Sequence, residues 1–386
     1  MADTSFVASI DDLHEKARKA TGLDDFGDPS YLEGLTVLAE SLDEDDHLSP
    51  MGTAIYQGQL LEILSTRLRV EARLEQQQRA SVNPIDRPII ITGLVRTGST
   101  ALHYLIGQDP DLQKLEYWLA AEPQVRPPRD EWESHPDFEA AIKELDFFYG
   151  NAPELMAVHE MKADWPEECR HILEQNFTDD RFETSATLPR YNDWYHGNVH
   201  HGTYRRHRKV IELIGSSDPD RRWLLKYPVH LRQLSALFEV YPDACIVQTH
   251  RDPRTVIASY ASFISKVRAV HQTDVDVAFV AREQMESWAH AAEAGMRYRD
   301  EHGSDQFFDL QFDEFMADPI DSVKQIYARF DQTLSPQGEA SLRAWHEHHP
   351  QGKHGQHRYE HKDFGVSEVE ILDRFAAYME RHDMQP

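Results

Sequence analysis

The chain has 386 residues, of which 67 are acidic and 40 are lysine or arginine, so its net charge is −27 with histidine neutral. Such an acidic surface repels nucleic acid, which excludes it as an expected partner, and repels small anions unless basic side chains gather locally. We therefore expect any anion site to show as a few basic residues at special places. The length is enough for one large domain or two modest ones, and the 40% of hydrophobic residues can bury a sizeable core.

The cysteine content and the N-terminal sequence favour a cytoplasmic protein. The two cysteines, Cys169 and Cys245, cannot build a disulfide framework and suit a reducing compartment. Residues 1–6 lack the basic and apolar regions of a signal peptide. No apolar run approaches the roughly 20 residues of a membrane helix, so no transmembrane segment is expected. The oligomeric state is left open.

Residues 1–83 are predicted to form a helical extension packed on the remainder, residues 84–386, which we expect to be one α/β domain. Start signals for three helices stand at Ser9 or Asp11, at residues 27–30 and at Ser49. The third helix carries an apolar stripe typical of a core-facing helix: Leu60, Leu61, Ile63, Leu64, Leu68 and Leu74. Residues 75–78 and 81–84 are predicted to form a linker.

Short apolar runs alternate with helical patterns in the remainder of the chain. Strands are predicted at residues 88–92, 223–226, 244–249 and 307–310, and helices at residues 101–106, 231–240 and 253–264. This alternation favours a parallel sheet with helices on both faces, an α/β fold of the P-loop-like, three-layer type. Residues 118–135 are predicted to be loop, and residues 366–381 a final amphipathic helix.

The sharpest motif is the segment from Gly93 to Thr100, which lies between a predicted strand and a predicted helix. Its two glycines allow a tight turn and a close approach to a ligand, and amides at a helix N-terminus attract anions. The motif differs from the nucleotide loop G-x4-G-K-[ST], because Ser99 replaces the lysine and the loop's cation is Arg96. The alternative interpretation is an ordinary strand-to-helix turn.

The residues at the ends of the later predicted strands indicate whether the site binds a metal ion. In nucleotide loops the lysine works beside Mg²⁺, which an aspartate at the end of another strand holds. The strands at 223–226 and 244–249 do not end in aspartate, although the one at 307–310 contains Asp309. We expect basic side chains to neutralise the ligand without a metal.

Three sequence blocks together carry a family resemblance: residues 88–100, 223–231 and 249–260. In this order and spacing they resemble the sulfotransferase superfamily that uses 3′-phosphoadenosine-5′-phosphosulfate. The similarity is to its bacterial, mycobacterial-type branch, which is related to the protein-tyrosine and heparan sulfate sulfotransferases. Weaker similarity to the family is found at residues 312–319 and 359–365, and the first 80 residues lie outside the resemblance.

The resemblance implies a set of site residues. Arg96 falls at the basic position of the 5′-phosphosulfate loop, Lys226 at the strand lysine near the leaving group, and Arg251 and Ser259 at the 3′-phosphate positions. The donor-binding residues are then expected to be Gly93, Arg96, Thr97, Gly98, Ser99, Thr100, Arg251, Ser259 and, by a looser match, Lys353 and Arg358. The implied cofactor is 3′-phosphoadenosine-5′-phosphosulfate, with 3′,5′-adenosine bisphosphate as product and no metal.

The block at 249–260 is also consistent with an anion site by itself. Arg251 follows a predicted strand, Asp252 is a plausible helix cap and Pro253 suits the first helical position. An arginine at a strand end can bind a phosphate with two hydrogen bonds. The alternatives are a surface turn with a salt bridge and a kinase-type catalytic loop; the latter lacks the required asparagine and has Pro253 opening a helix.

The general base is harder to assign. Cytosolic family members have a histidine two residues after the strand lysine, where this chain has Pro228. Neighbouring branches use a glutamate after the first helix, and the nearest carboxylates here are Glu116 and Glu122. The bacterial branch commonly shows Pro-Glu-Glu before a helix, which corresponds to Glu167 and Glu168. We expect Glu168 to be the base, then Glu167, placed in the first helical turn, where acidic residues also serve simply to stabilise the helix dipole.

Histidines are numerous in two regions: His196, His200, His201 and His207, then His346, His348, His349, His354, His357 and His361. Their spacing does not match a zinc motif, so solvated or anion-contacting histidines are expected rather than metal ligands.

The acceptor is not named by the sequence. Trp118, Trp165, Trp194 and Tyr195 are candidates for a pocket, although aromatic residues in such segments are more often core. The predicted N-terminal helices are expected to cap the cleft and give it apolar walls. Together with the acidic surface, this favours a small hydrophobic or lipid-like alcohol over a sulfated glycan. Two other functions stay open: a P-loop-type small-molecule kinase, which requires Mg²⁺ and ATP, and a non-catalytic nucleotide-binding protein, which binds donor without turnover.

Overall fold

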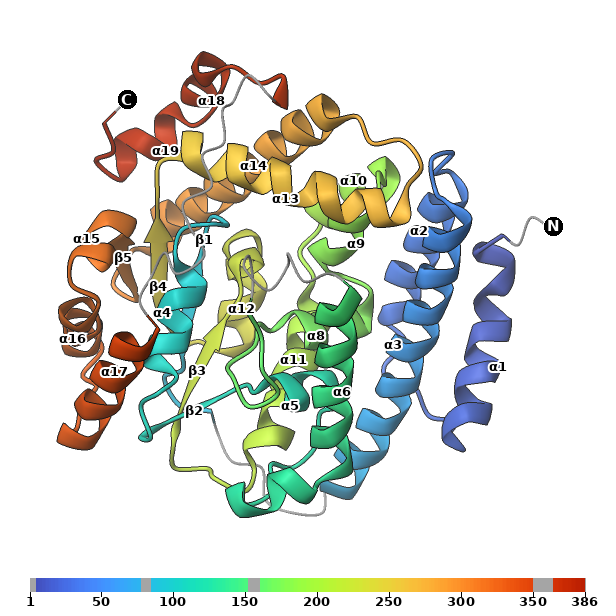
Figure 1. The fold of residues 1–386 in the computed structure, drawn as a ribbon, viewed down its shortest axis with the longest axis horizontal. Helices are drawn as coiled ribbons and strands as arrows, with labels where there is room; N and C mark the ends of the chain where they lie inside the picture. The colour runs from blue at the N-terminus through green and yellow to red at the C-terminus, as the bar shows by residue number, and fades with distance from the viewer. Residues whose placement is uncertain (1–4, 78–84, 152–159, 350–363, 386) are drawn as a thin grey trace.

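The computed structural model describes residues 5–77, 85–151, 160–349 and 364–385. Its centre is a five-stranded parallel sheet in the order β2-β3-β1-β4-β5 (Figure 1). The strands are β1 (Ile89–Gly93), β2 (Leu112–Lys114), β3 (Arg222–Lys226), β4 (Cys245–His250) and β5 (Phe307–Gln311). The predicted α/β fold class is confirmed.

Helices cover both faces of the sheet because its central strands are apolar on both sides. Ile90 packs into one core, whereas Ile89 and Ile91 pack into another. The first core includes side chains of α11 (His201–Gly215), α12 (Leu234–Val240), α13 (Pro253–His271) and α14 (Val277–His302). The second includes side chains of α4 (Ser99–Ile106), α15 (Phe312–Ala317), α16 (Pro319–Arg329) and α17 (Pro336–His348). The molecule is therefore three-layered.

The register brings three strand ends to one edge of the sheet. β1 lies between β3 and β4, with Ile91 opposite Lys226 and Gly93 opposite Thr249. Because all three strands run in the same direction, the segments after β1, β3 and β4 emerge together. This edge is where ligands of open α/β sheets bind.

The N-terminal helices pack on the α/β layers. They are α1 (Ile10–Thr21), α2 (Tyr31–Asp43) and α3 (Pro50–Gln77), drawn in blue in Figure 1, and α1 packs along α3. Their apolar side chains join the first core, and the buried Arg67 donates to the carbonyls of Phe26 (2.7 Å) and Gln175 (3.0 Å). All three helices begin where the start signals predict. The linker prediction is wrong at residues 75–77, which continue α3.

Several predicted boundaries are also wrong. Residues 118–135 are not all loop, because they include most of α5 (Tyr117–Ala121) and a 3-10 helix, η2 (Arg129–Ser134). The predicted C-terminal helix is two short helices, α18 (Glu368–Arg374) and α19 (Ala376–Arg381), and strand β2 was not predicted. The remaining elements of the described residues are η1 (Val7–Ser9), α6 (Pro136–Asn151), α8 (Arg170–Leu173), η3 (Glu174–Asn176), α9 (Asp180–Ser185), α10 (Pro189–Gly197) and η4 (Pro228–Gln233).

Among the described residues, no helix combines the length and apolar character needed to cross a membrane.

Candidate active site

The loop between β1 and α4 has an unusual backbone. Gly93, Arg96 and Gly98 have positive φ angles of 139°, 60° and 84°. A Cβ atom at Gly93 would lie 2.4 Å from the carbonyl oxygen of Thr249 on the neighbouring strand. The left-handed geometry and this close approach explain the glycine at position 93. The loop then leads into α4, whose first amides have no partners within the helix and which begins at the sheet edge where β3 and β4 also end.

Substituting Gly93 with alanine is expected to destabilise the protein by about 2–4 kcal/mol, because the new Cβ meets rigid backbone in a strained conformation. Urea denaturation measures the change. Gly58→Ala is the matched control, since Gly58 is exposed in α3 and an added Cβ meets no atom within 4 Å. An unchanged midpoint for Gly93→Ala would contradict this account of the loop.

The loop hydroxyls divide between loop structure and the site. Thr97 is buried; its hydroxyl donates to the carbonyl of Leu94 (2.7 Å) and lies 2.6 Å from the hydroxyl of Thr249. Its side chain therefore holds the loop against β4, and any contact with an anion would come from its amide. Thr100, by contrast, accepts a hydrogen bond from Lys226 at 3.1 Å.

Lys226 ends β3 directly beside this loop. Its side chain is only 2% exposed, and the ammonium group is bonded both to the Thr100 hydroxyl and to the Glu168 carboxylate. Burial of an ammonium group is costly without such partners. The lysine predicted to act at the leaving group is thus fixed at the start of α4, opposite a carboxylate.

Arg251 approaches the same loop from the end of β4. Its guanidinium donates to the carbonyl of Arg96 (3.0 Å) and stacks on the ring of Phe312, 3.9 Å from the ring centroid. Arg96 in turn donates from Nε to the hydroxyl of Ser259 on α13 (3.3 Å). The loop therefore brings together three basic residues: it contains Arg96 and is hydrogen-bonded to Lys226 and Arg251. One ligand could contact all three only if they lie this close to the same loop.

The two arginines are close enough to influence each other. Burial, followed by the positive charge of Arg96, lowers the pKa of Arg251 from its usual value. Two positive charges repel each other more strongly when they are partly buried than in water, and a bound anion between them reduces that repulsion. The electrostatics thus suit a bound anion.

The Pro-Glu-Glu segment lies across the strand end from this loop. The amide of Glu167 donates to the carbonyl of Leu115 (2.7 Å), and the amide of Cys169 donates to that of Lys226 (3.1 Å). Glu167 is buried, and its carboxylate accepts from the amide of Glu168 (2.8 Å), whereas the side chain of Glu168 is 20% exposed. The expected position in the first helical turn is wrong, because Cys169 is the N-cap of α8.

The other carboxylates considered for the base are engaged elsewhere. Glu116 is buried in an ion pair with Arg126 (3.0 Å). Glu122 binds Arg69 and Arg73 of α3 (2.7 and 2.6 Å). These ion pairs hold α3 and the segment that follows β2 in place. Of the carboxylates considered for the base, Glu168 is the one that contacts Lys226.

The remaining predicted positions fall into three groups. Lys353, Arg358, His354, His357 and His361 lie outside the described residues. Trp118 and Tyr195 are buried core residues, whereas Trp165 and Trp194 are half-buried. The prediction of solvated or anion-contacting histidines is wrong for His200 and His207, which are buried. His196, by contrast, contacts the carboxylate of Glu183 (2.9 Å).

Two contacts were missed by sequence reasoning. Phe312, which supports Arg251, belongs to the segment of weaker similarity at residues 312–319, but its role depends on a contact across the fold. Tyr227 donates its hydroxyl to the buried carboxylates of Asp179 and Asp180, directly after Lys226 in the chain. Neither contact has a local sequence signal.

The acidic pair has a consequence for stability. Burial, then the charge of Glu183, raises the pKa of Asp180 to about 6, and burial, then the charge of Asp180, raises the pKa of Asp179. The folded state therefore holds a proton that the unfolded state releases near pH 4. The stability this proton contributes is present below pH 4 and is lost as the pH rises through about 6.

In Asp180→Asn the side chain at position 180 stays neutral at every pH, so the pH-dependent loss of stability should disappear. As the pH rises from 4 to 7, the free energy of unfolding of the variant should increase relative to that of wild type by up to about 2–3 kcal/mol. Urea denaturation at each pH measures the difference. Asp193→Asn, at an exposed position on α10, is the control. A constant difference between variant and wild type across this range would contradict the assignment.

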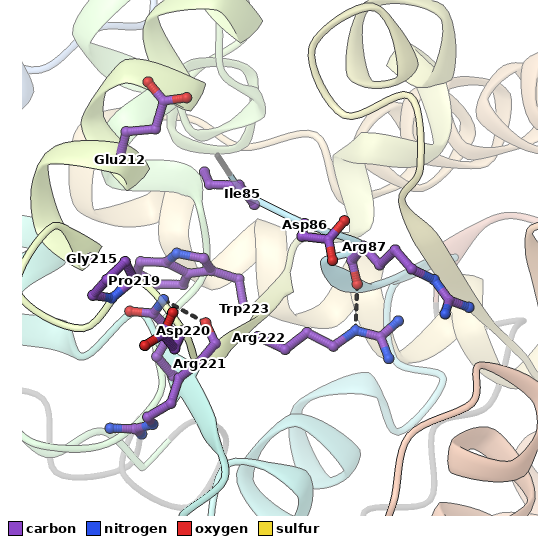
Figure 2. A pocket seen from close by; sticks show the side chains of 11 residues that line it. Ile85, Asp86, Arg87, Glu212, Gly215, Pro219, Asp220, Arg221, Arg222 and Trp223 are labelled. Atoms are coloured by element: carbon purple, nitrogen blue, oxygen red, sulfur yellow. Dashed lines mark hydrogen bonds between the residues drawn. The ribbon is translucent and has the colours of Figure 1, made fainter. Parts of the chain in front are cut away.

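A cavity of about 180 Å³ lies at the opposite edge of the sheet (Figure 2). It is lined by residues just before β1 and at the start of β3, including Ile85, Arg87, Arg222 and Trp223. Because these are the amino ends of the strands, the cavity is separate from the site at the carboxyl ends.

Comparison with known proteins agrees with this geometry. The model of a sulfotransferase family matches residues 88–336. The crystal structure of sulfotransferase STF1 from Mycobacterium tuberculosis is 35% identical, with a TM-score of 0.88, over 97% of this chain and all of that one. Sulfotransferase STF9 from Mycobacterium avium is 25% identical, with a TM-score of 0.91, over 100% of this chain and 98% of that one. A search of curated proteins finds no match.

The chain therefore belongs to the sulfotransferase family, and it is similar to mycobacterial members over its whole length. Family and fold together support sulfotransfer as its activity.

Proposed function

We propose that this protein transfers a sulfuryl group from 3′-phosphoadenosine-5′-phosphosulfate to a hydroxyl of a small hydrophobic or lipid-like acceptor. The observation that carries the proposal is the convergence of Arg96, Lys226 and Arg251 on one loop at the carboxyl edge of the sheet. In a chain of net charge −27, this convergence supplies the local positive charge that an anionic donor needs.

The donor would be anchored at its two phosphates. Amides from Gly93 to Thr100, with the hydroxyls of Ser99 and Thr100, suit the 5′-phosphosulfate at the N-terminus of α4. Arg251 and Ser259 suit the 3′-phosphate. The hydrogen bond from Arg96 to Ser259 (3.3 Å) joins the two halves of this binding region.

The transfer step is an in-line displacement at sulfur. The acceptor oxygen forms a bond to sulfur, while the bond from sulfur to the bridging oxygen breaks and leaves its electron pair on the 5′-phosphate. Lys226 and Arg96 stabilise the negative charge that grows on that oxygen, the kind of stabilisation that dominates many group transfers. Cations of the chain suffice for this role, so the step is proposed to need no divalent metal.

Glu168 would accept the proton of the acceptor hydroxyl. Its carboxylate lies at the end of β3, bonded to Lys226, and is partly open to solvent. When Lys226 turns to the leaving oxygen, the carboxylate becomes available to the acceptor. The same pair thus links charge stabilisation with proton removal, two effects that depend on positioning.

Half-buried aromatic side chains beside Glu168 suit a hydrophobic acceptor. Trp165, two residues before Glu167, packs against Tyr104 of α4 and Trp345 of α17, with ring centroids 5.2 and 4.9 Å apart. Such a surface favours apolar contact with an alcohol, and the acidic surface disfavours sulfated glycans.

A transfer assay tests the proposal. The protein is incubated with ³⁵S-labelled donor and a panel of sterols, phenols, fatty alcohols and glycolipids in buffer containing EDTA. We expect label in a hydrophobic acceptor and equimolar release of 3′,5′-adenosine bisphosphate. Transfer that requires Mg²⁺, or phosphoryl transfer from ATP, would contradict it.

A further inference from the structure

Behind the Lys226–Glu168 pair, three side chains converge from distant parts of the chain. Cys169 follows Glu168, His230 lies in η4 four residues after Lys226, and His207 lies on α11. All three are fully buried, and each places one donor atom within 4.8 Å of the other two.

The hydrogen bonds of the two histidines leave one ring nitrogen of each without a partner. Nδ1 of His230 is bonded to the hydroxyl of Tyr204 (2.7 Å), and Nδ1 of His207 to the hydroxyl of Tyr241 (2.9 Å). Within the part of the chain that the structure describes, Nε2 of neither ring has a hydrogen-bond partner. An unpaired buried polar atom is costly, so two of them beside a buried thiol require an explanation.

The geometry points to a metal ion: we infer that Cys169, His207 and His230 form a buried site for a transition-metal ion of the soft or borderline class. One sulfur and two imidazole nitrogens suit Zn²⁺ or Cu⁺, whereas Mg²⁺ and Ca²⁺ prefer oxygen ligands. Binding releases the thiol proton to solvent, and the metal bonds to the thiolate and to Nε2 of each ring.

The surroundings match those of metal-binding histidines. Such rings commonly have their second nitrogen hydrogen-bonded, which fixes their orientation, and here tyrosine hydroxyls hold both Nδ1 atoms. The rings meet edge to face, 5.8 Å between centroids and 79° between planes. Around zinc, ligand atoms lie about 3.3–3.6 Å apart, so the three donor atoms need to draw together by only about 1 Å.

The ion would join three elements at the back of the active site. Cys169 also donates its amide to the carbonyl of Lys226 (3.1 Å), so the thiolate side of the site is continuous with the segment that carries Glu168. A bound metal would fix this segment to η4 and α11 without touching donor or acceptor. Its role is thus structural and separate from the proposed transfer step.

Metal content and spectroscopy on the untagged full-length protein test the inference. After incubation with Zn²⁺, or anaerobically with Cu⁺, and removal of excess, we expect about one tightly held ion per chain. Substitution with Co²⁺ should give a thiolate-to-cobalt charge-transfer band. The Cu⁺ and Zn²⁺ arms identify which ion is held more tightly.

Cys169→Ser should lose the band and the tightly held ion, while Cys245→Ser, at the other buried cysteine, should keep both. The half-buried His346 and the exposed His348 are unchanged in both variants, so weak metal binding at such histidines affects both variants equally. Zn²⁺ should also raise the melting temperature of wild type but not of Cys169→Ser. Wild-type protein that holds no tightly bound ion in either arm, or a cobalt band that persists in Cys169→Ser, would overturn the inference and leave a buried water as the partner of the histidines.

Discussion

Lys226→Ala and Arg96→Ala are each expected to lower kcat about 10²–10³-fold, the usual effect of removing one donor that stabilises charge in the transition state. Both side chains contact the loop that would hold the 5′-phosphosulfate, Lys226 through Thr100 and Arg96 as part of the loop itself. Steady-state kinetics with saturating donor and acceptor measure the effect.

Two surface variants control for the loss of a positive charge. Lys324 pairs with Glu339 on the surface, and Arg190 pairs with Glu40 and Glu44. Lys324→Ala and Arg190→Ala should retain wild-type turnover. Because Lys226→Ala leaves the Glu168 carboxylate without its ammonium partner, its circular dichroism spectrum must match wild type before its rate is interpreted. Near-normal turnover in both active-site variants would remove these residues from the mechanism.

Glu168→Gln is expected to lower kcat about 10²–10⁴-fold, because an amide cannot accept the acceptor's proton. The variant keeps the shape of the side chain and an oxygen for Lys226, so donor affinity should change little. The pH–rate profile should lose the limb that reports the base. Donor affinity is measured as a control: an unchanged value shows that the variant is still folded, so that the lower kcat reports the loss of the base.

Glu122→Gln distinguishes the proposed base from the alternative near the first helix. Glu122 is bound to Arg69 and Arg73, away from Lys226, so its variant should keep the wild-type pH profile. A pH profile unchanged in Glu168→Gln but altered in Glu122→Gln would reverse the assignment.

The parts of the fold with strong local signals were predictable from the sequence. Strand β1 opens with three consecutive isoleucines, and glycines stand at positions 93 and 98, where the backbone adopts positive φ angles that favour glycine. Asp252 and Pro253 begin α13 as expected, with the aspartate accepting from the amide of Arg254 (2.8 Å). Each of these features depends on residues close together in the chain.

The parts that depend on contacts across the fold were not predictable. Strand β2 has three residues, too few for a periodic pattern, and it forms because β3 offers it a partner. The pairing of Glu168 with Lys226 joins residues 58 positions apart. The sequence around His207 is rich in polar and charged residues, which suggested a solvent-exposed side chain. In the fold, His207 lies on the buried face of α11, so the prediction of exposure was wrong.

The central claim is that Arg96, Lys226 and Arg251 bind one adenine nucleotide at both of its phosphate groups without a divalent ion. Titration calorimetry with 3′,5′-adenosine bisphosphate in EDTA tests it most directly, compared with ATP and Mg²⁺, for wild type and Arg251→Ala. We predict that the bisphosphate binds wild type more tightly than ATP does, and that Arg251→Ala weakens it about 10–100-fold, the value of one charge-assisted contact. ATP with Mg²⁺ binding as tightly as the bisphosphate, or bisphosphate affinity unchanged in Arg251→Ala, would contradict the account.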